Sequence, residues 1–371
     1  MPKQTPLYSV HKALGASLTE FHGFLLPLEY TTITEEHMAV RNRAGIFDLS
    51  HMGEIEISGG AALEFIQGII ANDAEGLSDG KALYTPICNE RGGIVDDVML
   101  YRFSAERFVL VVNAGNIQKM FDWLVGNQTK NVTINDLSDG LGMIAVQGPA
   151  SASIIEEALG RDEANIRRFH FLVNEQAAAD PVTVSRTGYT GEDGFEMYVP
   201  VAQCETIWNR IMGAGTKKGL QPAGLGARDT LRVEAGLLLY GNDIDDHTTP
   251  LEAGIDWTVK FDKGDFIGRA ALLDQKASGI RMRLVGLELV ERGIPRAGCR
   301  IFAGSNIVGK VTSGTHSPFF KKGIAMGYVY AEERCSNVGS LVHVDVRGTR
   351  LAARIIKLPF YRVKYHGKHF N

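Results

Sequence analysis

The stretch Asn89-Glu-Arg-Gly-Gly-Ile-Val-Asp-Asp-Val-Met-Leu-Tyr101 joins a glycine-rich turn to an apolar strand that carries two adjacent carboxylates. Successive side chains of a strand point to opposite faces of the sheet. We therefore expect Asp97 on one face, together with Met99 and Tyr101, and Asp96 on the other. This alternation predicts that the two aspartates look away from each other and form no proton-sharing pair.

One of these aspartates must lie among hydrophobic residues or in a pocket. An ionised carboxylate in such a place is costly unless a cation or hydrogen-bond donor meets it. Two interpretations stay open at this point: a turn-end aspartate bonded to backbone amides, or a functional site. The strand turns back at residues 104–107 into Phe108–Asn113, which predicts an antiparallel hairpin. Asn113 ends the return strand, so we expect it to share a pocket with Asp97.

The composition indicates an ordinary globular protein of two or three domains, with 371 residues, 44% hydrophobic and 22% charged. The net charge of -4 argues against a nucleic-acid-binding surface. The four cysteines are far apart, so neither a disulfide framework nor a metal site is expected. The start of the chain has no signal-peptide pattern and no apolar run is long enough to span a membrane, so we predict a cytoplasmic protein without membrane contact.

The pattern of predicted helices and strands changes near residue 280. Before that point strands alternate with helices in an order that does not demand a parallel sheet, which indicates an α+β fold. One predicted helix spans residues 34–44, with Thr34 as its N-cap and Gly45 as its stop. Beyond residue 280, short β-rich pieces separated by glycine-containing turns predict a small β-barrel or sandwich. We therefore divide the chain into residues 1–275 and 280–371.

Several charged and aromatic residues on glycine-rich connections are candidates for a binding pocket. Aromatic rings supply stacking faces, a glutamate offers two acceptor oxygens to neighbouring N–H groups, and an arginine can orient a ring carbonyl or a carboxylate. Together they fit a flat, nitrogen-rich heterocycle. Each one alone also has an ordinary structural explanation: Trp257 as plain core, for example, or Arg228 paired with Asp229. The candidates are Tyr84, Asp97, Tyr101, Asn113, Tyr189, Glu196, Arg228 and Trp257.

A longer series of motifs resembles the T-protein of the glycine cleavage system, an aminomethyltransferase. The resemblance runs in order through almost the whole chain. It implies a three-lobed cloverleaf, in which two α+β lobes are interleaved in sequence and a β-barrel follows at the C-terminal end. The motifs are Ser50-His-Met-Gly53, Asn89–Tyr101, Val112-Asn-Ala114, Ala145-Val-Gln-Gly-Pro149, Arg186-Thr-Gly-Tyr-Thr-Gly-Glu-Asp-Gly-Phe-Glu196, Pro222-Ala-Gly-Leu-Gly-Ala-Arg-Asp229, Leu239-Tyr-Gly-Asn-Asp243, Arg292-Gly-Ile-Pro-Arg296 and Thr312-Ser-Gly-Thr-His-Ser-Pro318.

The resemblance also implies an activity. The lipoyl arm of a carrier, the H-protein, presents an aminomethyl group, and the one-carbon unit passes to tetrahydrofolate with release of ammonia, giving 5,10-methylenetetrahydrofolate. The other glycine cleavage components would be further partners. By this resemblance Asp97 matches the essential aspartate. The remaining matches are Glu196 and Tyr189 at the pterin, Asn113 and Arg228 nearby, Tyr84, Met52, Tyr101 and Trp257 as walls, and Arg362 at the entry of the arm.

Two alternatives remain open from the sequence. One is a folate-dependent demethylase of the same superfamily that acts on a free methylated substrate. The other is a non-catalytic folate-binding assembly factor, whose relatives carry the signature Lys-Gly-Cys-Tyr-x-Gly-Gln. The corresponding segment here is Arg186-Thr-Gly-Tyr-Thr-Gly-Glu192, which has no cysteine and therefore disfavours the assembly role.

Overall fold

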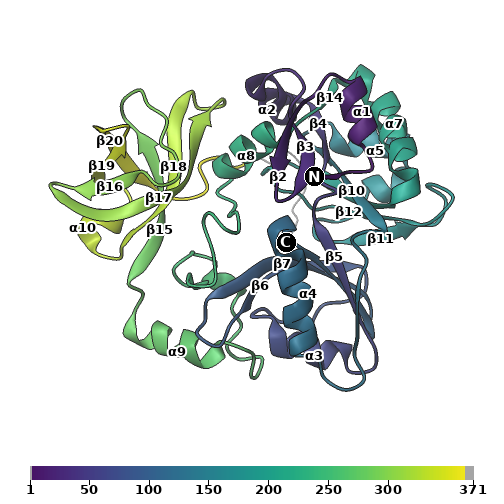
Figure 1. Ribbon diagram of the computed structural model, residues 1–371, viewed down its shortest axis with the longest axis horizontal. Helices are drawn as coiled ribbons and strands as arrows, with labels where there is room; N and C mark the ends of the chain where they lie inside the picture. Colours follow the sequence, from purple (N-terminus) through teal and green to yellow (C-terminus); the bar gives the residue numbers. More distant parts are fainter. Residues whose placement is uncertain (1, 364–371) are drawn as a thin grey trace.

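Two α+β lobes and a β-barrel meet around a common centre in the computed structural model, which describes residues 2–363 (Figure 1). The chain begins the first lobe, leaves it after β4 (Ala44–Asp48) to build the second lobe, and returns at β10 (Leu141–Gln147). The two lobes are therefore interleaved in sequence. The barrel, green to yellow in Figure 1, lies to one side of both.

The first lobe is built on a six-stranded sheet. Its neighbours are antiparallel except β14, which pairs with β4 in parallel. A large apolar cluster fills the space between this sheet and the helices on its outer face. In spatial order the strands are β11 (Phe171–Asn174), β12 (Val182–Ser185), β13 (Gly194–Pro200), β10, β4 and β14 (Leu220–Pro222), and the covering helices are α1 (Tyr8–Ala13), α5 (Ser151–Ala158), α6 (Arg161–Ala164) and α7 (Cys204–Gly215).

The second lobe has a five-stranded antiparallel sheet. Helices α3 (Ala62–Ile69) and α4 (Ile117–Gly126) bury their apolar sides on one face of it. The other face packs against the sheet of the first lobe through a second apolar cluster, to which Val111 and Met143 belong. The strands, in spatial order, are β6 (Lys81–Cys88), β7 (Ile94–Ser104), β8 (Arg107–Val112), β5 (Gly53–Ser58) and β9 (Thr133–Asp136).

The C-terminal lobe is a closed six-stranded barrel, so of the two predicted architectures the barrel is correct. Helix α9 (Arg269–Ser278) precedes its first strand, and α10 (Glu333–Ser336) follows β18. The division at residues 275 and 280 stays a prediction. Around the barrel the strands are β15 (Met282–Leu289), β18 (Lys322–Tyr330), β17 (Asn306–Ser317), β16 (Arg300–Ala303), β19 (Leu341–Val346) and β20 (Thr349–Ile356).

The helix predicted over residues 34–44 begins one residue earlier and ends sooner. Helix α2 spans Ile33–Asn42, and its N-cap is Thr32, whose hydroxyl accepts a hydrogen bond from Glu35 N at 3.2 Å. Thr32 and Thr34 are both suitable caps by residue type. Thr32 is the one with an extended backbone, so the prediction of Thr34 is wrong. Gly45 lies inside β4.

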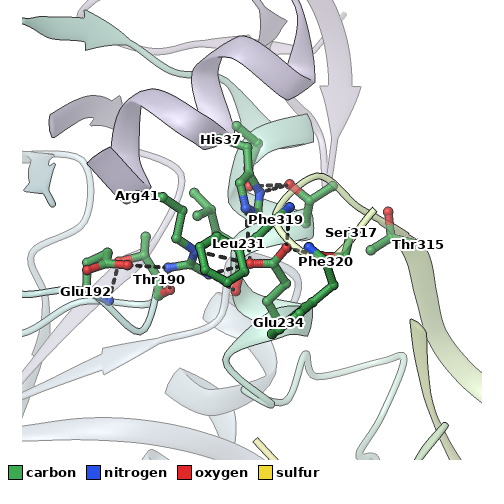
Figure 2. A network of polar contacts seen from close by, with 12 residues as sticks. His37, Arg41, Thr190, Glu192, Leu231, Glu234, Thr315, Ser317, Phe319 and Phe320 are labelled. Carbon is green, nitrogen blue, oxygen red and sulfur yellow. Dashed lines mark hydrogen bonds and ion pairs between the residues drawn. The ribbon is translucent and has the colours of Figure 1, made fainter. Parts of the chain in front are cut away.

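A buried polar joint holds the lobes together at Glu234, the last residue of α8 (Leu225–Glu234) (Figure 2). Its Oε2 accepts hydrogen bonds from Arg41 at 2.9 and 3.1 Å and lies 3.1 Å from His37 Nε2, both on α2. Its Oε1 accepts from the Ser317 hydroxyl and, at 3.3 Å, from Phe319 N of the barrel. One buried carboxylate thus connects α2, α8 and the barrel.

A smaller sheet near the start of the chain contains β1 (Lys3–Gln4), β3 (Phe24–Glu29) and β2 (Ser17–Phe21). Helix α8 contacts β3 and α2 on one side and the barrel strands β17 and β18 on the other.

Within residues 2–363, no helix is long and apolar enough to cross a membrane.

Candidate active site

A cavity of about 2130 Å³ lies where the three lobes meet. Its walls come from both sheets, from α8 and the chain after it, and from the barrel. The structure places nine of the ten site residues predicted from the sequence on its lining. They are Asp97, Tyr84, Asn113, Met52, Tyr189, Glu196, Arg228, Trp257 and Arg362.

The glycine-rich turn before β7 fixes the start of the aspartate strand. Asn89 Oδ1 accepts hydrogen bonds from Arg91 N at 2.9 Å and from Gly93 N at 3.1 Å. A side chain at Gly93 has no room, because a Cβ there would lie 1.8 Å from the carbonyl oxygen of Asp246. The turn can therefore approach the chain that follows α8 closely.

Asp97 lies on the second-lobe wall of the cavity. The Tyr84 hydroxyl donates to its Oδ2 at 2.9 Å, and Asn113 Nδ2 donates to its Oδ1 at 2.9 Å. The predicted sharing of a pocket by Asp97 and Asn113 is confirmed. Burial raises the pKa of Asp97 to about 6, although both hydrogen bonds favour its ionised form. The carboxylate is thus partly desolvated, and no cation neutralises it among the side chains described.

Asp96 points to the other face, as the alternation predicts, but it is not independent of Asp97. Its carboxylate is fully buried and accepts from Asn113 Nδ2 at 2.7 Å, the same nitrogen that donates to Asp97. The two carboxylates thus face away from each other as predicted, and one amide nitrogen bonds to both. A register shift opposite Val95 interrupts the alternation, and Val95 packs on the α3 and α4 side.

Glu196 lies on the first-lobe wall of the cavity. It is in β13 opposite Ala145 of β10, so its side chain shares the face that looks toward the second lobe. The Thr187 hydroxyl donates to Glu196 Oε2 at 2.5 Å. Burial raises the pKa of Glu196, while Thr187 and the charge of Arg228 oppose the rise. No donor among residues 2–363 reaches Oε1, which remains available to a ligand.

Arg228 and Tyr189 form a second recognition element. The guanidinium carbon lies 4.6 Å from the centroid of the Tyr189 ring, and the Tyr189 hydroxyl donates to the carbonyl of Leu238. The simple alternative that Arg228 pairs with Asp229 is wrong, because Asp229 pairs with Arg232 at 2.8 Å. In the described structure no carboxylate lies within ion-pair distance of Arg228. Its donors therefore face the cavity uncommitted.

Tyr101 does not line the cavity, so its expected place in the wall is wrong. Its side chain is only 1% exposed. Its hydroxyl accepts from Tyr198 at 2.9 Å and lies 3.2 Å from the Thr187 hydroxyl. It lies four positions after Asp97, about 13 Å along β7, and this distance places it between the two sheets. From there it supports Thr187, and through Thr187 the carboxylate of Glu196.

Trp257 and Arg362 lie at the mouth of the cavity. Trp257 is 60% exposed, and its ring centroid is 6.2 Å from that of Tyr84. The core interpretation of this tryptophan is wrong. Arg362 is exposed and follows Tyr361, whose backbone N–H donates to Glu234 O at 2.8 Å. Met52, in the turn before β5, lines a deeper part of the wall.

Sequence reasoning missed several polar residues of the site. Thr187 lies inside a quoted motif, two residues before Tyr189, and that spacing was the only signal for it. Asn116, which donates to Asp96 Oδ1 at 2.8 Å, follows Asn113 by three residues and gave no signal. His51, within the motif Ser50-His-Met-Gly53, also lines the cavity. Burial, aided by the charge of Arg228, lowers its pKa to about 3, so it is neutral at pH 7.

The lining offers several groups that can recognise a flat, nitrogen-rich ring. No group of three metal-ligating side chains occurs in the part of the chain that the structure describes. Among residues 2–363, Glu196 Oε1 accepts no hydrogen bond and Arg228 forms no ion pair, and Tyr84 and Tyr189 offer ring faces. A flat ring with adjacent N–H groups, a carbonyl and an acidic tail satisfies all of these groups at once.

Comparison with known protein families shows which family the chain belongs to. The model of the GCVT N-terminal domain matches residues 7–263, and that of the glycine cleavage T-protein C-terminal barrel domain matches residues 282–362. The chain belongs to the glycine cleavage T-protein family. The resemblance noted from the motifs is thus confirmed.

Individual members of the T-protein family match over almost their full length. An aminomethyltransferase of Desulforamulus reducens is 46% identical over 360 residues, 97% of this chain and 98% of the relative. One from Pseudothermotoga lettingae is 46% identical over 362 residues, 97% and 98% of the two chains. The crystal structure of aminomethyltransferase T of the Bartonella henselae glycine cleavage system is 35% identical, covers 97% of this chain and 98% of that chain, and superimposes with a TM-score of 0.91. The predicted α+β class and three-lobed arrangement are confirmed.

Proposed function

We propose that this aminomethyltransferase of the glycine cleavage system binds tetrahydrofolate in the central cavity, with Asp97 beside the nitrogen that receives the one-carbon unit. The observation that carries the proposal is the placement of Asp97, a half-buried carboxylate that no cation among residues 2–363 neutralises, on a cavity whose opposite wall holds Glu196 and Arg228. The donor of the one-carbon unit is the aminomethyl-lipoyl arm of a carrier, the H-protein.

The first-lobe wall is suited to the pterin ring. Glu196 Oε1 accepts from neighbouring N–H groups of the ring, and Thr187 holds the other oxygen in place. The ring of Tyr189, fixed by its bond to Leu238, provides a flat surface. Arg228 then orients a ring carbonyl or the carboxylate tail of the folate.

The transfer breaks one carbon–sulfur bond and one carbon–nitrogen bond and forms two carbon–nitrogen bonds to the folate. Two protons leave the folate nitrogens; one ends on the lipoyl sulfur and the other leaves with ammonia. The carbon passes through an iminium-like cation, which a fixed carboxylate stabilises. A carboxyl group with a pKa of about 6 is mostly ionised at pH 7. Because this pKa lies near the working pH, the carboxylate can accept a proton during the reaction.

Positioning contributes as much as charge. The donor carbon must meet the folate nitrogen at a separation of about 3–3.5 Å, and holding both reactants together supplies a large share of the rate. The exposed ring of Trp257 and the guanidinium of Arg362 border the mouth through which the lipoyl arm enters. Docking of the H-protein, contact with the other glycine cleavage components and residence in the cytoplasm are parts of the same proposal.

The direct test is an assay with purified protein, tetrahydrofolate and aminomethyl-lipoyl carrier. We expect ammonia and methylenetetrahydrofolate in equal amounts, and neither product from a carrier whose lipoyl group bears no aminomethyl group. One-carbon transfer from a free methylated amine, together with no reaction of the loaded carrier, would identify a demethylase and overturn the proposal. Folate binding without turnover of any donor would support the assembly-factor alternative.

Glu196→Gln is expected to weaken tetrahydrofolate binding by about 1–3 kcal/mol, because a neutral amide replaces a charged acceptor against buried N–H donors. Isothermal titration measures the change directly. The matched control is Glu56→Gln on β5, where the carboxylate pairs with Arg107 at 2.6 Å outside the cavity lining. The control should bind like the wild type. An unchanged titration for Glu196→Gln would show that the pterin contact is wrongly assigned.

A further inference from the structure

Asp96 is a buried carboxylate held by amide groups alone. It has no exposed surface and accepts three hydrogen bonds: Asn113 N at 3.2 Å, Asn113 Nδ2 at 2.7 Å and Asn116 Nδ2 at 2.8 Å. No basic side chain forms an ion pair with it among the residues described. A carboxylate so placed is not needed for packing, since an apolar residue would avoid its desolvation cost.

The Asn113 side chain couples Asp96 to Asp97. Its Nδ2 lies 2.7 Å from Asp96 Oδ1, 2.9 Å from Asp97 Oδ1 and 3.1 Å from the Asp97 carbonyl oxygen. A primary amide nitrogen carries two hydrogens, so three acceptors compete for two donors. Any change in charge on one carboxylate therefore redistributes these bonds to the other.

Few positively charged side chains near Asp96 and Asp97 could offset the negative charge of both carboxylates. The nearest amine, Lys119 Nζ, bonds Val95 O at 3.0 Å and is committed to Asp246 at 2.8 Å. The titratable and charged groups that face the pair are Tyr84 on β6, Lys119 on α4, Tyr189 in the turn before β13, Arg232 on α8, paired with Asp243 at 2.6 Å, and Tyr240, Asp243 and Asp246 in the chain after α8.

Burial raises the pKa of both carboxyl groups. Burial, followed by the charge of Asp97, raises the pKa of Asp96 to about 7, whereas burial and the charge of Asp243 raise the pKa of Asp97 to about 6. Asp97 therefore ionises first and Asp96 second. Two carboxyl groups that interact in this way titrate as a pair. The pair therefore loses its last proton near neutral pH, which is also the range in which the transfer reaction moves protons.

We propose that Asp96 is a positioning residue for the transfer reaction: through the shared Asn113 amide it orients the Asp97 carboxylate. Asp96 touches neither the folate nor the carrier arm. The proton released by the folate nitrogen goes to Asp97 and leaves with ammonia or the lipoyl thiol, while Asp96 keeps its hydrogen bonds throughout. This inference rests on the proposed role of Asp97.

The test is Asp96→Asn, which keeps the size of the side chain and removes its charge. We expect kcat to fall about tenfold and KM for tetrahydrofolate to stay within twofold, because the Asn113 amide that holds Asp97 loses a charged acceptor. The acid limb of the pH profile of kcat/KM should stay in place, because Asp97 ionises while Asp96 is still neutral. Asp79→Asn, the same change at an exposed residue that pairs with Arg102, should keep the wild-type kcat.

A second measurement does not depend on activity or on the variant folding well. Carbon NMR of wild-type protein with labelled aspartate should show two carboxyl signals that each titrate in two steps, and Asp97→Asn should reduce the Asp96 signal to one step. A wild-type kcat in folded Asp96→Asn, or independent single-step titration in the wild type, would overturn the inference. Absence of transfer by the wild-type protein would instead overturn the proposed function.

Discussion

Asp97→Asn is expected to lower the rate of methylenetetrahydrofolate formation by about 10²–10⁴-fold, the usual contribution of a positioned acid–base group. The amide neither stabilises the iminium-like carbon nor accepts a proton from the folate nitrogen. It still fits between Tyr84 and Asn113, whose bonds to Asp97 are 2.9 Å each. The affinity for tetrahydrofolate should therefore change little. The decrease should appear in the turnover rate measured with aminomethylated carrier.

Tyr84→Phe is the graded comparison for Asp97→Asn. It removes only the hydroxyl that donates to Asp97 Oδ2 and leaves the charge in place. A loss of about 1 kcal/mol, roughly fivefold, is the expected size for one such bond. If Asp97→Asn kept wild-type turnover, or lost no more than Tyr84→Phe, Asp97 would not be the catalytic carboxylate.

Glu234→Ala is expected to lower the free energy of unfolding by about 3–5 kcal/mol, because it leaves the buried Arg41 without its main counter-charge. The same change frees Ser317 and Phe319 N of the barrel (Figure 2). Urea denaturation followed by fluorescence measures the loss. The cavity depends on how α8 meets the barrel, so folate affinity should fall in the folded fraction as well.

Glu288→Ala is the matched control for Glu234→Ala. Glu288 also bonds a basic residue, Lys322 at 2.6 Å, but both side chains are partly exposed at the barrel surface. An exposed pair contributes about 0–1 kcal/mol. Equal losses in the free energy of unfolding for the two variants would show that the buried contacts of Glu234 stabilise the protein no more than an exposed ion pair does.

The stability supplied by Glu234 should also depend on pH. Burial raises the pKa of this carboxyl, but the contact with His37 and the charge of Arg41 outweigh it, so the pKa is lowered. A lowered carboxyl pKa stabilises the folded protein above the ordinary carboxyl range, and that stability is lost as the pH falls through the lowered value. The difference between wild type and Glu234→Ala should therefore shrink in acid.

Local rules were enough to predict the parts of the site that lie on one hairpin. Alternation along the strand separated Asp97 from Asp96, and the return of the chain at residues 104–107 brought Asn113 beside Asp97. The change to short β-rich pieces near residue 280 predicted the barrel. These features depend on neighbours within about twenty residues, which sequence patterns record directly.

The predictions that failed needed information beyond the hairpin pattern. Tyr101 leaves the cavity because the sheet of the first lobe, a distant segment of the chain, packs over it. Arg228 has no carboxylate partner among the described residues because Asp229 pairs with Arg232, three residues further along α8, and the sequence offers Asp229 both partners. The coupling of Asp96 to Asp97 depends on the side-chain rotamer of Asn113, which reaches both carboxylates, and residue spacing does not specify a rotamer.

The interleaving of the two lobes has a consequence for synthesis on the ribosome. Residues 44–48 form a central strand of the first sheet, yet their hydrogen-bonding partners are residues 141–147 and 220–222. All five strands of the second sheet lie between residues 53 and 136 and can pair before residues 220–222 are translated. The second lobe can therefore form from one continuous segment while the first sheet still lacks β14, and closing that sheet over a long chain separation is the slow step expected of such a topology.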